Sequence, residues 1–131
     1  MCIKDRTFIK WSDVIMFEFL LEKMYYFYLV RNRINRRGYV GKTTDSSVAG
    51  VPITLNQMEK IVEERFKQHI SSARIGDSSV FHRALDEYGP ENFELFIIEI
   101  GYLTETESRD KEKELMDKFN TLLPFGYNSK E

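Results

Sequence analysis

The chain has 131 residues, 42% of them hydrophobic and 31% charged, which is the length and composition of one globular domain with its own core. The formal net charge of −2 argues against a uniformly basic nucleic-acid binder. The charge is unevenly distributed, however, because residues 23–42 contain six Lys/Arg and no Asp/Glu. A cationic patch on an otherwise acidic body is still suited to docking on phosphate.

The cysteine content and the apolar segments limit where the protein is expected to work. Cys2 is the only cysteine, so the sequence excludes an internal disulfide and a cysteine-based metal site, and it favours an intracellular protein. The apolar run at 14–21 is interrupted by Glu18 and is too short to span a bilayer. No small-residue cleavage site follows it, so we predict neither a membrane segment nor a signal peptide.

An N-terminal extension, residues 1–24, is predicted to precede a domain at 25–131. Its stretch 14–21 is apolar on nearly every side and is compatible with either a helix or a strand. Such a segment has to be buried, and two partners remain open. It packs either on the back of its own sheet or on a second copy, in a homodimer formed through residues 12–24.

Two β-prone apolar runs, 26–30 and 39–40, flank a polar segment that ends in glycine, and this pattern predicts a β-hairpin. Tyr28 and Tyr39 stand in its two strands and are either a packing pair on the sheet or functional groups. The polar segment is either a solvated basic loop or a surface that docks on nucleic acid. Its basic side chains are Arg31, Arg33, Arg36 and Arg37.

A capping box that begins at Thr54 predicts a helix that runs to about residue 73. Arg65 and His69 fall one turn apart inside the apolar face of this helix. A histidine on such a face is often a satisfied core residue, and an arginine can extend to solvent along its aliphatic stem. An arginine in the middle of an apolar stripe is costly, however, unless it is paired or lines a wet pocket, and we favour the pocket.

The next segments are predicted to be a helix and a strand. Ser78 or Ser79 begins the helix, and the Gly-Pro pair at 89–90 ends it. Residues 92–100 form the apolar run NFELFIIEI, which predicts a strand buried on both faces. The chain is then predicted to turn at 101–102.

A second capping box begins at Thr104 and predicts a last helix that runs to about Phe119. The apolar face of this helix is thin and consists of Leu115, Met116 and Phe119. Glu112 lies in the middle of that seam by helical spacing. A carboxylate in this position is paired, binds a metal or borders a cleft; the alternative is a partly exposed glutamate near the start of the helix.

The order of these features resembles the GIY-YIG nuclease superfamily over roughly residues 24–128. The Gly-Ile-Tyr and Tyr-Ile-Gly signature stands here as Tyr26-Phe27-Tyr28, ten residues, then Tyr39-Val40-Gly41, with Tyr26 in place of the first glycine. The other family motifs stand in the same order, as Arg65-Phe66-Lys67-Gln68-His69, Phe81-His82-Arg83-Ala84-Leu85, Glu112 to Met116 and Gly126-Tyr127-Asn128. The segment between Gly41 and Arg65 is longer than in the family, with 46–58 as a candidate insert.

The resemblance implies an α/β fold with a central three-stranded, mainly antiparallel sheet flanked by helices. It also implies a DNA endonuclease that hydrolyses phosphodiester bonds with a single divalent metal ion, Mg²⁺ or Mn²⁺. In that mechanism Glu112 holds the metal, Arg65 binds a nonbridging phosphate oxygen, and Tyr28 and Tyr39 position or deprotonate the attacking water. Lys42 or His69 lowers a tyrosine pKa, and Asn128 orients the phosphate or the tyrosines.

Two further functions are considered beside the endonuclease. One is a nuclease-fold module that binds nucleic acid without cutting it, and the other is an unrelated small α/β interaction protein. The presence of the complete set of family residues favours the nuclease; these are Tyr28, Tyr39, Arg65, Glu112 and Asn128. Because three residues follow Asn128, target specificity is expected to come from the N-terminal segment, the insert or a partner, or to be absent.

Overall fold

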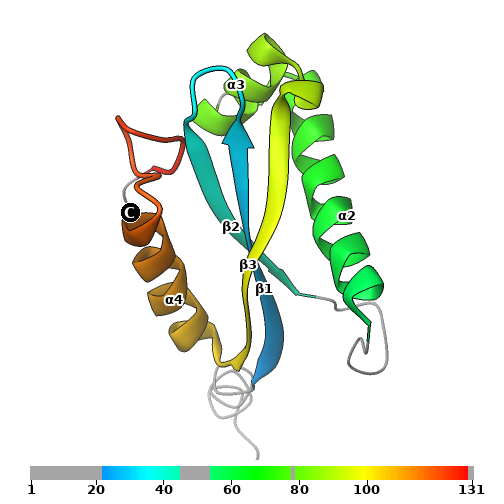
Figure 1. Ribbon diagram of the computed structural model, residues 1–131, viewed down its shortest axis with the longest axis vertical. Helices are drawn as coiled ribbons and strands as arrows, with labels where there is room; N and C mark the ends of the chain where they lie inside the picture. Colours follow the sequence, from blue (N-terminus) through cyan, green and yellow to red (C-terminus); the bar gives the residue numbers. More distant parts are fainter. Residues whose placement is uncertain (1–21, 45–53, 78, 130–131) are drawn as a thin grey trace, which may run out of the picture.

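The computed structural model describes residues 22–44, 54–77 and 79–129. The elements in these ranges follow one another as β1 (Lys23–Asn32), β2 (Gly38–Thr44), α2 (Leu55–Arg74), α3 (Val80–Tyr88), the short 3-10 helix η2 (Pro90–Asn92), β3 (Phe93–Leu103) and α4 (Glu105–Lys118) (Figure 1). The expectations for the N-terminal extension up to residue 21, its dimer interface included, and for most of the insert at 46–58 lie outside the described residues.

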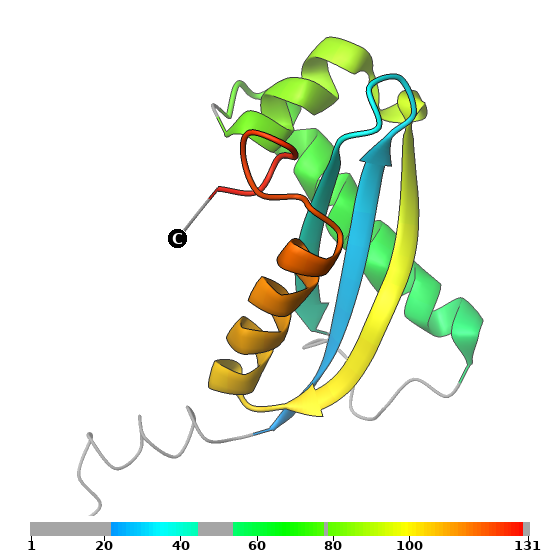
Figure 2. The ribbon, with the colours of Figure 1, turned by 60° about the vertical axis from the view of Figure 1, so that its left-hand side comes forward.

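The three strands form one sheet in the order β2-β1-β3, and both pairings are antiparallel. Helices α2 and α3 cover one face of the sheet and α4 covers the other (Figure 2). The predicted α/β fold, with a three-stranded antiparallel sheet between helices, is therefore confirmed. In the part of the chain that the structure describes, no helix is long and apolar enough to cross a membrane.

The middle strand, β1, carries the core on both of its faces. Every residue from Tyr25 to Val30 is at most 4% exposed. Because side chains alternate along a strand, the even-numbered residues pack with α2 and α3, and the odd-numbered residues pack with Leu115 of α4. The short run at 26–30, rather than the longer run at 92–100, is thus the strand that is buried on both faces.

The prediction that 92–100 is buried on both faces is wrong, because β3 lies at the edge of the sheet. Phe96 is 43% exposed and Ile100 is 38% exposed. The predicted turn at 101–102 is also wrong, since both residues pair with β1 and the strand continues to Leu103. An apolar run specifies a strand but not its place in the sheet, which depends on how the other strands pair.

The helix boundaries follow the capping signals in the sequence. Thr54 and Thr104 each form a complete capping box at the start of α2 and α4, and Ser79 caps α3 through a bond from the His82 amide. Each such cap is worth about 1 kcal/mol. α3 ends at Gly89, whose φ of 85° suits a residue without Cβ. These caps define where the three helices begin and where α3 ends.

Candidate active site

Tyr28 lies beside Gly41 on the neighbouring strand β2. The Tyr28 ring crosses this glycine, so that a Cβ at position 41 would overlap the end of the ring and its hydroxyl. The glycine of the Tyr-Val-Gly motif is therefore required by the side chain of the first motif. Tyr28 is 1% exposed, and burial raises its pKa well above the ordinary tyrosine value.

Aromatic contacts hold the second tyrosine in place. The Tyr39 ring stacks on Phe81 of α3, with ring centroids 4.1 Å apart and planes inclined by 2°. The same ring meets the edge of His69 at a centroid distance of 5.4 Å. Tyr39 is partly exposed where Tyr28 is not, and burial is the main cause of its raised pKa. The two tyrosines are thus rigidly placed but differ in their access to solvent.

His69 of α2 uses both ring nitrogens. Its Nε2 lies 2.8 Å from the Tyr28 hydroxyl, and its Nδ1 lies 2.8 Å from Nε2 of His82. His69 is 3% exposed. Burial, with a smaller contribution from the Arg65 charge, lowers the pKa of His69 to about 3. The imidazole is therefore neutral at physiological pH.

Arg65 lies one helical turn before His69 and points to the outside of this buried group. Its Nη1 donates to the side-chain oxygen of Gln68 at 2.9 Å, and the arginine lines a cavity of about 410 Å³ together with Lys42 and Glu105. The positive charge of Arg65 acts to lower the pKa of Tyr28, against the larger effect of burial. Arg65 therefore stands between the buried tyrosine and solvent.

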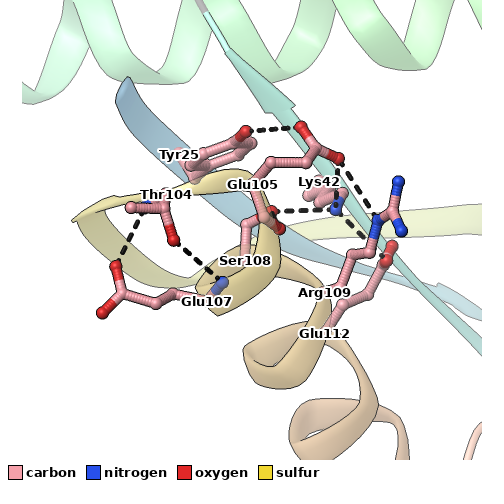
Figure 3. Close-up of polar contacts among 8 residues, drawn as sticks. All are labelled: Tyr25, Lys42, Thr104, Glu105, Glu107, Ser108, Arg109 and Glu112. Atoms are coloured by element: carbon pink, nitrogen blue, oxygen red, sulfur yellow. Dashed lines mark hydrogen bonds and ion pairs between the residues drawn. The ribbon is translucent and has the colours of Figure 1, made fainter. Parts of the chain in front are cut away.

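A charged network lies on the other face of the sheet, between β2 and α4 (Figure 3). Lys42 Nζ donates to the Ser108 hydroxyl at 3.0 Å. It also lies 3.8 Å from one carboxylate oxygen of Glu105 and 3.8 Å from one of Glu112. Tyr25 donates to the second oxygen of Glu105 at 3.0 Å, and this bond is the main reason that the pKa of Glu105 is lowered. Lys42 is thus held between two carboxylates and a hydroxyl.

Glu112 is the more buried of the two carboxylates, with a side chain that is 22% exposed. Burial raises its pKa, and Lys42 partly opposes this shift. The carboxylate also lines a cavity of about 740 Å³, which it shares with Lys42 and Arg109. Its negative charge acts to raise the pKa of both Tyr28 and Tyr39, although Glu112 comes from the opposite side of the sheet.

The donor set suits a weakly caged, hydrated cation better than a metal held by many side chains. No group of three or more His, Cys, Asp or Glu able to hold a metal occurs among the described residues. Glu112 instead offers one carboxylate on a wide cavity. Mg²⁺ sheds its water reluctantly and commonly binds proteins through one or two carboxylates, so the residues present fit this ion.

Asn128 is bonded to the backbone of β2 through both polar groups of its side chain. Its side-chain oxygen accepts from the Val40 amide at 2.8 Å, and its amide group donates to the Val40 carbonyl at 2.9 Å. Gly126, two residues earlier, leaves no room for a Cβ against the backbone of Thr121. The Gly-Tyr-Asn motif therefore fastens the end of the chain to the strand that carries Tyr39 and Lys42.

The four hairpin arginines lie further along β1 and its turn, away from the cavities. Arg36 and Arg37 are exposed, and Arg33 is 3.8 Å from Glu94 with a side chain that is 58% exposed. An ion pair this exposed contributes little stability. Arg31 is half-buried, so its charge is less accessible than the other three.

The structure adds four residues that the sequence reasoning did not select. Glu105 and Ser108 lie seven and four residues before Glu112 and share its helix face, so helical spacing contained a signal for them. His82 and Asp77 join His69 through the packing of α3 on α2. Their contact depends on tertiary structure, and no spacing in the sequence predicts it.

Comparison with known proteins places this geometry in a known fold. Neither a family model nor a curated protein matches the chain. The catalytic domain of homing endonuclease I-TevI matches with a TM-score of 0.59 and 21% identity, over 84% of this chain and 99% of that one. A single-residue mutant of the intron endonuclease I-TevI catalytic domain matches with a TM-score of 0.58 and 22% identity, over 82% and 91% of the two chains.

The chain has the fold of this endonuclease catalytic domain. The GIY-YIG fold that the order of motifs predicts is thereby confirmed.

Proposed function

We infer that the protein is a DNA endonuclease that hydrolyses phosphodiester bonds at the β2 edge of its sheet. The observation that carries this proposal is the convergence of two tyrosines, an arginine and a carboxylate from both faces of the sheet. Arg65 and Glu112 line neighbouring cavities that share Lys42, and the charges of both act on Tyr28. The fold of a homing endonuclease catalytic domain supports the same function.

Glu112 is proposed to hold the metal ion, with water completing the coordination. A bound Mg²⁺ or Mn²⁺ supplies Lewis-acid stabilisation of the phosphate and of the leaving 3′ oxygen. Lys42 keeps the Glu112 carboxylate oriented toward the cavity, since the ammonium is itself fixed by Ser108 and Glu105. The arrangement uses one carboxylate, which agrees with a single-metal mechanism.

Arg65 is proposed to bind a nonbridging phosphate oxygen. Its planar guanidinium is able to donate two parallel hydrogen bonds, and it already lies on the cavity wall. Charge on the phosphoryl oxygens increases toward the transition state, so a fixed cation in this place lowers the barrier.

Tyr28 is proposed to deprotonate the attacking water, and Tyr39 to position it. Only Tyr28, of the two, has a neutral imidazole nitrogen 2.8 Å from its hydroxyl to take up its own proton. The high pKa of Tyr28 opposes ionisation in the resting state, so proton uptake by His69 has to accompany proton transfer from water. Tyr39 is the more exposed ring, and its centroid lies 6.4 Å from that of Tyr28.

DNA docking is proposed to use the exposed arginines of the hairpin, chiefly Arg33, Arg36 and Arg37. These cations provide sequence-independent contact with phosphates and leave target choice to other parts of the chain or to a partner. The N-terminal extension at 1–24, a homodimer through residues 12–24 and an intracellular location stay predictions.

Incubation of purified protein with supercoiled plasmid tests the proposed function. Relaxed or linear product in Mg²⁺, and none in EDTA, supports it. Retention of DNA on a gel without cleavage in any divalent metal would instead identify a nucleic-acid-binding module. Neither binding nor cleavage would exclude both.

A further inference from the structure

A continuous set of polar contacts leads from Tyr28 to the loop between α2 and α3. The Tyr28 hydroxyl contacts Nε2 of His69, and Nδ1 of His69 contacts Nε2 of His82, both at 2.8 Å. Nδ1 of His82 then lies 3.3 Å from Oδ1 of Asp77, a distance longer than a well-formed hydrogen bond. This buried nitrogen has no closer polar partner among the described residues. Asp77 is therefore the group that acts on it.

Asp77 is held in place independently of the histidines. The Ser79 amide donates to Oδ1 of Asp77 at 2.9 Å, at the N-terminus of α3. This bond, followed by the contact with His82, lowers the pKa of the Asp77 carboxyl. His82 is fixed in the same helical turn, because its amide donates to the capping Ser79 hydroxyl at 3.2 Å. The carboxylate and the second imidazole are thus built on one capped helix end.

The carboxylate gives the whole set of contacts one direction. A carboxylate only accepts, so Nδ1 of His82 has to carry a proton. With one proton on His82, its other nitrogen is an acceptor, so Nε2 of His82 accepts from Nδ1 of His69. Nε2 of His69 is then left without a proton and accepts from the Tyr28 hydroxyl. Without Asp77, the hydrogen bonds could equally run in the opposite direction, and in that arrangement the Tyr28 hydroxyl would accept from Nε2 of His69.

We propose that Asp77 and His82 are positioning residues that hold His69 with its proton on Nδ1 and so orient the Tyr28 hydroxyl toward His69. When Tyr28 takes a proton from water, its own proton passes to Nε2 of His69. The water becomes hydroxide, Tyr28 stays neutral, and His69 becomes an imidazolium that Asp77 stabilises through His82. This catalytic consequence rests on the proposed nuclease function, whereas the position of the proton on His69 does not.

The position of the proton is measured without DNA or metal. Long-range ¹H–¹⁵N correlation spectra of the ¹⁵N-labelled full chain distinguish protonated from bare imidazole nitrogens. We expect His69 to be protonated at Nδ1 and bare at Nε2 in the wild-type protein. A wild-type spectrum with the proton on Nε2 of His69 would overturn the proposal, and this arm does not depend on any variant folding.

Asp77→Asn keeps the shape of the side chain but allows it to donate as well as accept. This variant is expected to give His69 a detectable population with the proton on Nε2. Asp86→Asn, which changes an exposed aspartate of α3, is the matched control and is expected to leave the His69 signals unchanged. Identical His69 signals in Asp77→Asn and wild type would show that Asp77 does not determine the position of the proton on His69.

Cleavage kinetics separate this proposal from the proposed function. In an active enzyme, Asp77→Asn is expected to lower kcat about tenfold and to leave KM unchanged, because the variant loses orientation of the base and not substrate contact. A protein that shows the expected proton position but cuts no DNA would contradict the nuclease function alone. An active protein in which Asp77→Asn cuts at the wild-type rate would contradict the positioning role.

Discussion

The two faces of the sheet contribute opposite kinds of chemistry to the same edge. On the α2 and α3 face, the Tyr28 hydroxyl and the His69 and His82 rings form a connected set of polar contacts that ends at the Asp77 carboxylate. On the α4 face, Lys42 and Glu112 belong to a charged group that borders open cavities. The buried group is suited to holding protons in defined places, and the charged group to binding an ion and a phosphate.

Strand β2 contributes to both groups. β2 presents Gly41 to one face and Lys42 to the other, so adjacent residues serve different groups. The Asn128 side chain holds the same strand through hydrogen bonds to both the amide and the carbonyl of Val40. A strand anchored in this way keeps the two groups at a fixed separation.

Removal of the carboxylate from the charged group is expected to have the largest effect. Glu112→Gln should lower plasmid cleavage in Mg²⁺ by about 10³-fold or more, since several kcal/mol of charge stabilisation would be lost. Thermal stability should be nearly unchanged, because burial already disfavours the ionised form. Glu114→Gln, which removes an exposed glutamate of the same helix, is the control and should cut normally. Full activity of Glu112→Gln would contradict the proposal that Glu112 holds the metal ion.

Removal of the tyrosine hydroxyl from the buried group is expected to have the next largest effect. Tyr28→Phe should slow single-turnover cleavage roughly 10²- to 10³-fold, the range of general-base catalysis. It should also lower stability by about 1–3 kcal/mol, because Nε2 of His69 is left buried without a partner. Tyr39→Phe should slow cleavage less. Wild-type rates in both variants would show that the tyrosines are packing residues.

Replacement of Arg65 by lysine is expected to have a smaller effect on rate, because the charge is kept. Arg65→Lys should lower kcat by roughly 10- to 10²-fold, the cost of one charge-assisted hydrogen bond that an ammonium cannot reproduce. Arg74→Lys, an exposed position near the end of the same helix, serves as the control. An Arg65→Lys enzyme with normal kcat and raised KM would move Arg65 from the transition state to substrate binding.

Changes outside both groups are expected to act on binding alone. Replacement of Arg36 and Arg37 by serine should reduce the slope of log affinity against log salt by about 2, because each phosphate contact contributes about 0.9. Cleavage at saturating DNA should be unaffected. An unchanged salt slope, measured by fluorescence anisotropy, would place the DNA contact elsewhere on the surface.

Local signals in the sequence were sufficient to predict where helices α2 and α4 begin and which of their site residues face inward. Side-chain to backbone bonds at Thr54 and Thr104 are local, so the capping boxes predict where α2 and α4 begin. Helical spacing likewise predicts that His69 and Glu112 face inward, since burial of a helix face follows its period.

The remaining features depend on contacts between segments far apart in the chain. The edge position of β3 follows from strand order, which its own apolar residues do not encode. The contact between His69 and His82 requires that the loop after α2 return the chain so that α3 packs on α2. Glu105 differs from these features, because helical spacing alone places it on the same face of α4 as Glu112.

The central claim is that a divalent ion held by Glu112 on one face serves the tyrosines packed on the other. Mn²⁺, used in place of Mg²⁺, broadens NMR signals of nearby nuclei and therefore reports this placement directly. We predict selective broadening of the Tyr28, Tyr39 and His69 side-chain signals at low Mn²⁺, absent with Mg²⁺ and lost in Glu112→Gln. Signals of Phe96, on the far edge strand, should be unaffected. Equal broadening in the wild type and in Glu112→Gln would contradict the claim.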